Sequence, residues 1–118
     1  MKYYEIELNG RTVKFRLTSG DCMTIEKTSG KAITDFVGDL SMSSIITLLR
    51  YMVRSSQHDF SQEDASKLYD ELVDEGYTLE KIISEIIMEA LAVSGFMSKK
   101  DLDKIRDVKE EIKEKATK

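Results

Sequence analysis

The feature that most constrains this chain is YYEIELNGRTVKFRL at residues 3–17, where apolar and polar residues alternate on both sides of an Asn-Gly pair. Asn9 and Gly10 readily take the positive φ angles of a type I′ turn, so the spacing predicts a two-residue β-hairpin. Such a turn fixes the register. The predicted cross-strand pairs are Ile6–Val13, Tyr4–Phe15, Glu5–Lys14 and Tyr3–Arg16. One face of the hairpin is then apolar, and we expect it to lie on helices because an isolated hairpin is marginal in water.

The next part of the chain changes to a helical period. After Thr18, a short helix is expected to turn Cys22, Ile25 and also Met23 inward, and to end just before Gly30. A second short helix is expected from a stripe of apolar residues at helical spacing, and we expect Gly38 to interrupt it. Its apolar members are Ile33, Phe36, Val37 and Leu40.

Three longer stripes predict three further helices, each preceded by a residue that can cap it. The helix after Ser41 has the inward residues Met42, Ile45, Ile46, Leu49, Met52 and Val53. The helix after Ser61, which also has a capping-box Asp64, has Ala65, Leu68, Tyr69, Leu72 and Val73 and ends at Gly76. The helix after Thr78 ends near Gly95, and its stripe is Leu79, Ile82, Ile83, Ile86, Ile87, Ala90 and Leu91.

These elements predict an α+β fold that is mostly α, with the N-terminal two-stranded hairpin packed on a bundle of about four to five helices. Residues 1–98 form the hairpin and helical domain. Residues 99–118 form a charged C-terminal helix that partly frays, because its last ten residues offer only Ile112 as a large apolar side chain.

Four carboxylates fall within nine residues in LYDELVDEG at residues 68–76. Asp70, Glu71, Asp74 and Glu75 lie on the side of the predicted helix away from its apolar stripe. No calcium-loop spacing surrounds them. We therefore expect a solvated helix face, with an acidic metal enzyme as the weaker hypothesis.

Charge, cysteine content and hydrophobicity limit which partners and which cellular compartment this chain is expected to have. The 118 residues carry a formal net charge of -4, which argues against nucleic acid or an anionic membrane surface as the main partner. A single Cys cannot form an internal disulfide, which is typical of a cytosolic protein. Residues 82–96 are interrupted by Ser84, Glu85 and Glu89, so no membrane span is expected there.

No catalytic, metal-binding or cofactor-binding residue is expected. His58 is the only His and lies in a polar connector, and Cys22, the only Cys, faces inward on a short helix. Zinc, phosphate-loop and hydrolase motifs are absent from the sequence. Arg50 and Arg54 stand one helical turn apart, which gives an alternative hypothesis of a small helical regulatory domain that binds nucleic acid through them. The simpler interpretation is a surface pair or a salt bridge to the acidic helix.

Several apolar residues fall outside the predicted stripes. Grouped at the surface they would mark a partner-binding site, whereas in a wider helix–helix interface they would belong to the core. They are Leu48, Tyr51, Met88, Phe96 and Met97.

The order of these parts resembles the tail assembly chaperones of bacteriophages with long non-contractile tails, particularly those of Gram-positive hosts. The resemblance covers residues 1–97. It rests on the hairpin, on IEKTSGK and LLRYMV, and most of all on LYDELVDEGYTLEKIISEIIMEALAVSGF, where an acidic helix ends in Gly and leads into a helix closing on Ser-Gly-Phe.

The resemblance implies a non-enzymatic helper that acts in the host cytoplasm and is absent from the mature virion. Its implied partners are the tape measure protein, the tail tube protein and a longer frameshifted form of the chain itself, with self-association as a further possibility. It implies no cofactor, no nucleic acid and no membrane.

Overall fold

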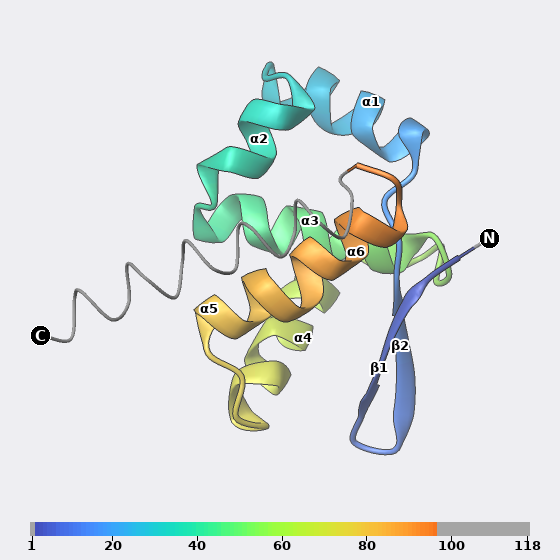
Figure 1. Ribbon diagram of the computed structural model, residues 1–118, viewed down its shortest axis with the longest axis vertical. Coiled ribbons are helices and arrows are strands. Elements are labelled where there is room, and N and C mark those ends of the chain that lie inside the picture. Colours follow the sequence, from blue (N-terminus) through green and yellow to red (C-terminus); the bar gives the residue numbers. More distant parts are fainter. Residues whose placement is uncertain (1, 97–118) are drawn as a thin grey trace, which may run out of the picture.

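The computed structural model describes residues 2–96, and its chain begins with an antiparallel hairpin (Figure 1). Strands β1 (Tyr4–Leu8) and β2 (Arg11–Phe15) join at Asn9 and Gly10, whose φ angles are 51° and 80°. Both are positive, as a type I′ turn requires. The observed pairs Tyr4–Phe15, Glu5–Lys14 and Ile6–Val13 confirm the predicted register.

The apolar face of the hairpin is held against helices. Leu8, Val13 and Phe15 are buried, and β2 contacts α3 (Met42–Arg54) while β1 contacts α6 (Met88–Val93). The expectation that the hairpin lies on helices is therefore confirmed.

The first two helices follow the hairpin as a pair. Helix α1 (Ser19–Ser29) begins with a capping box between Thr18 and Asp21 and ends at Gly30, which has a φ of 73°. Helix α2 (Ile33–Asp39) runs through Gly38 and ends at Leu40. With Asp39 as its last residue, the helix ends one position beyond Gly38, close to the predicted interruption.

Helix α3 is the centre of the fold and contacts α2, α4 (Gln62–Asp74), β2 and the C-terminal helical segment. Its N-cap is Ser41, and α4 begins with the predicted capping box between Ser61 and Asp64. Because α3 has neighbours on several sides, eight of its thirteen residues are buried.

The last helical segment is continuous but not uniform. It consists of α5 (Leu79–Lys81), the π-helical stretch η1 (Ile82–Ile87) and α6. A π turn closes its hydrogen bond one residue later than an α turn. Met88 is buried here, together with the predicted core residues Ile82, Ile83, Ile86, Ile87, Ala90 and Leu91.

Within residues 2–96 the architecture is a two-stranded hairpin with five helical segments, counting α5, η1 and α6 as one. The predicted fold class, α+β and mostly α, is confirmed. Four residues expected to face inward are instead exposed: Met23, Met42, Val73 and Leu79. Three of the four lie in the first or last turn of a helix, where fewer elements cover the stripe. The predicted helix at 99–118 lies outside the described residues.

Candidate functional site

Three of the five apolar residues proposed for partner binding belong to the core. Leu48, Tyr51 and Met88 are buried at 0%, 7% and 6% exposure, so the surface alternative is wrong for these three residues. The alternative of a wider interface between helices accounts for them. Phe96 is exposed, and Met97 lies outside the described residues.

The acidic helix is only partly a solvated face. Asp70, Asp74 and Glu75 are exposed, as predicted. Glu71 instead accepts two hydrogen bonds from the Arg11 guanidinium at 2.6 and 2.7 Å, and a third from the Asn9 side-chain amide at 2.6 Å. This carboxylate therefore ties the hairpin turn to α4.

The electrostatics of this link follow from its geometry. Hydrogen bonds from Arg11 and Asn9 lower the pKa of Glu71 from 4.5 to about 2. The hydrogen bond with Glu71 raises the pKa of Arg11 in turn. A bidentate pair of this kind fixes orientation as well as charge, so it sets the position of β2 relative to α4.

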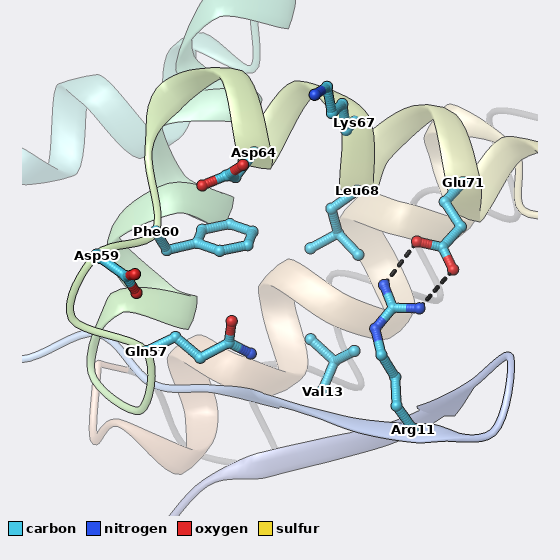
Figure 2. Close-up of a pocket in the computed structure, with 9 residues that line it drawn as sticks. All are labelled: Arg11, Val13, Gln57, Asp59, Phe60, Asp64, Lys67, Leu68 and Glu71. Carbon is cyan, nitrogen blue, oxygen red and sulfur yellow. Dashed lines mark hydrogen bonds and ion pairs between the residues drawn. The ribbon is translucent and has the colours of Figure 1, made fainter.

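A groove lies between β2 and α4, beside this ion pair (Figure 2). Its volume is about 320 Å³. The groove residues come from β2, from the connector between α3 and α4, and from α4 itself. They are Arg11, Val13, Gln57, Asp59, Phe60, Asp64, Lys67, Leu68 and Glu71.

The groove has an apolar floor and charged ends. Figure 2 shows Val13, Leu68 and Phe60 pointing into it, with the Arg11–Glu71 pair at one end and Asp59 at the other. Val13 and Leu68 are buried, and Phe60 is partly buried. The surface that the groove offers to a ligand is therefore mainly polar, and Phe60 is its accessible apolar residue.

Sequence reasoning missed this groove. Phe60 belongs to no helical stripe, and Arg11 and Glu71 are 60 positions apart. One signal was present, because Phe60 is a lone aromatic residue in an otherwise polar connector, directly before the Ser61 cap.

Of the two simpler interpretations of Arg50 and Arg54, the salt bridge to the acidic helix is not formed within residues 2–96. Their guanidinium carbons lie 5.3 and 5.6 Å from the centre of the Tyr51 ring; Arg50 directly precedes Tyr51, and Arg54 follows it by three positions. This distance suits cation–π contact. Arg54 also lines a second hollow, of about 590 Å³, with Tyr51 and His58.

Cys22 and His58 differ in exposure. Cys22 is buried, and burial, followed by the charges of Asp21 and Glu26, raises the pKa of its thiol. His58 is exposed in the connector after α3, as predicted. Across residues 2–96, no three His, Cys, Asp or Glu side chains gather as a metal site would require.

In the same part of the chain, none of the helices combines the length and apolar character needed to span a bilayer. Comparison of the chain with protein-family models, with curated proteins and with solved structures found no match.

The Arg11–Glu71 link predicts a pH-dependent contribution to stability. Because the pKa of Glu71 is lowered from 4.5 to about 2, its contribution is fully present above pH 4.5 and is lost as the pH falls to about 2. At pH 7 we expect Glu71→Gln to lower the free energy of unfolding by about 1 kcal/mol, a value reduced by the partial exposure of both side chains. Urea denaturation at pH 7 and pH 2 measures it.

The matched control is Asp70→Asn, which removes an exposed carboxylate from the adjacent position of α4. It should change stability by less than about 0.5 kcal/mol at either pH. An equal deficit for Glu71→Gln at pH 7 and pH 2 would contradict the ionic origin of the effect.

Proposed function

We propose that this protein is a non-enzymatic assembly chaperone of bacteriophage tails, and that it binds a segment of the tape measure or tail tube protein in the groove between β2 and α4. The resemblance of residues 1–97 to such chaperones supports the biological assignment. The observation that supports binding is the groove itself, in which Phe60 is the apolar residue most open to solvent and charged residues lie at both ends.

The physical task of such a chaperone is to cover apolar surface until assembly. Before assembly, the apolar side chains of a tape measure are exposed to water. Burying apolar surface contributes about 25 cal/mol per Å², and the net charge of -4 keeps the complex in solution. The chaperone acts in the host cytoplasm, leaves before the virion is complete, and works beside a longer frameshifted form of itself.

The proposal predicts that Phe60→Asp weakens capture of the partner. A charged side chain in the floor of the groove replaces apolar contact with a carboxylate that must lose its water. A central contact of this kind is worth about 2 kcal/mol, or roughly a 30-fold loss of affinity. Co-purification of the co-expressed tape measure and tube proteins, followed by titration of the bound one, measures it.

Two variants control this experiment. Met42→Asp introduces the same charge at an exposed apolar residue outside the groove, and it should leave capture unchanged. Phe96→Asp tests the exposed residue that was proposed from sequence. Capture lost with Phe96→Asp but kept with Phe60→Asp would move the binding site to the end of α6. Failure of wild-type protein to capture either tail protein would contradict the proposed function, as would a gene without phage tail genes beside it.

A further inference from the structure

One edge of β2 has unpaired backbone groups. In a hairpin with a two-residue turn, the pair next to the turn is hydrogen-bonded and the pairs then alternate. With Leu8 and Arg11 beside the turn, the pairs Glu7–Thr12 and Glu5–Lys14 are the ones without mutual hydrogen bonds. The N–H and C=O groups of Thr12 and Lys14 therefore point away from β1.

Arg16, two positions after Lys14, also has its N–H on the side away from β1, and the partner of this N–H shows which way the edge faces. The N–H of Arg16 donates to the carbonyl oxygen of Met52, near the end of α3, at 3.0 Å. The outer edge of β2 thus faces the end of α3 and the connector that follows it. Within residues 2–96, Thr12 and Lys14 have no backbone partner on this edge.

The same edge borders the groove. Both strand residues that line the groove, Arg11 and Val13, come from β2, and Gln57, Asp59 and Phe60 come from the connector. A chain segment in the groove would therefore lie within reach of the free groups of Thr12 and Lys14.

The charges of the groove are not balanced. Its two cations are both paired, Arg11 with Glu71 at 2.6 Å and Lys67 with Glu63 at 3.6 Å. Asp59 has no ion-pair partner among residues 2–96, whereas Asp64 accepts a hydrogen bond from the Ser61 N–H at 3.0 Å and also interacts electrostatically with Lys67. The end of the groove at the connector is therefore negative and attracts a cation.

We propose that the bound segment is extended and adds a third strand to the hairpin along the free edge of β2. An apolar side chain on its groove side packs on Phe60, and a Lys or Arg at one end meets Asp59. This inference rests on the proposed function and adds the conformation and chemistry of the segment. A helical segment would satisfy its own backbone and leave Thr12 and Lys14 to water.

Amide hydrogen exchange followed by NMR tests strand addition on the unmodified protein. The probes are overlapping 15-residue peptides that span the tape measure and tail tube proteins encoded beside this gene. At saturation with a bound peptide, exchange of the Thr12 and Lys14 amides should slow by at least about tenfold, as one added hydrogen bond implies. Glu5 and Glu7, the outward residues of β1, should exchange at an unchanged rate.

A pair of proline variants provides a matched test. Proline is tolerated on an edge strand where the N–H faces solvent. Lys14→Pro and Glu5→Pro both remove the ion pair between these residues, 3.8 Å long, but they remove outward N–H groups on opposite edges. Lys14→Pro should weaken peptide binding about tenfold, whereas Glu5→Pro should leave it within about twofold. Exchange in the unmodified protein decides the question if either variant fails to fold.

The outcomes separate the two proposals. A peptide that binds without protecting Thr12 and Lys14 overturns strand addition and leaves the proposed function standing. Absence of binding by every peptide overturns both. Protection of the same two amides that grows with protein concentration alone would assign the edge to a second copy of this chain, which overturns the partner segment proposed here.

Discussion

Met88→Asp is expected to unfold the protein or leave it largely insoluble. Met88 is 6% exposed and lies at the junction of η1 and α6, against the core. A carboxylate placed there loses its water without gaining a partner, which costs several kcal/mol. A domain of this size has a total stability of about 5–15 kcal/mol, so one such change removes much or all of it. Circular dichroism at 25 °C and urea denaturation measure the loss.

Met42→Asp is the matched control, because the substitution is the same and Met42 is 48% exposed in the first turn of α3. An acidic residue at a helix N-terminus interacts favourably with the helix dipole, so this variant should be at least as stable as wild type. If Met88→Asp were also folded and within about 1 kcal/mol of wild type, Met88 would be a surface residue. Met88 would then again be a candidate for binding a partner protein.

Phe15→Ala is expected to lower the free energy of unfolding by about 3–5 kcal/mol. Phe15 is fully buried at the end of β2, the strand that contacts α3. Removing its ring leaves a cavity between the hairpin and α3, and it weakens the contact that positions the groove-lining strand. The measurement is chemical denaturation with tertiary and secondary probes followed together.

Phe96→Ala makes the same substitution at a residue that is 43% exposed, so it should cost far less than Phe15→Ala. Separate transitions for the two probes in Phe15→Ala would mean that the hairpin detaches before the helices unfold. A cost below 1 kcal/mol would contradict the packing of Phe15 in the core.

The predictions for Phe15 and for Glu71 concern the groove as well as stability. The groove has one wall on the hairpin and the other on α4, so its shape depends on how the hairpin is docked. Phe15 holds the hairpin from the core side, and Arg11 holds it from the surface through Glu71. A variant that loosens either contact should weaken partner binding even where it touches no groove residue directly.

What the sequence by itself determined is the set of features governed by neighbouring residues. The Asn9–Gly10 turn and the register of the hairpin follow from local backbone geometry. The N-caps at Ser41, Ser61 and Thr78 follow from side chains that bond amides three positions on. Fold class follows from combining these local rules with the periods of the apolar residues.

Only the tertiary structure decided the features that depend on distant residues. The burial of Leu48, Tyr51 and Met88 depends on how many elements surround each helix, which the 3.6-residue period of one helix does not contain. The local pattern places Glu71 on a solvated face of its helix. In the structure Glu71 accepts hydrogen bonds from Arg11, which is 60 positions away in the sequence. The groove likewise joins three segments far apart in the chain, because burial and charge pairing are set by the whole packed molecule rather than by local sequence.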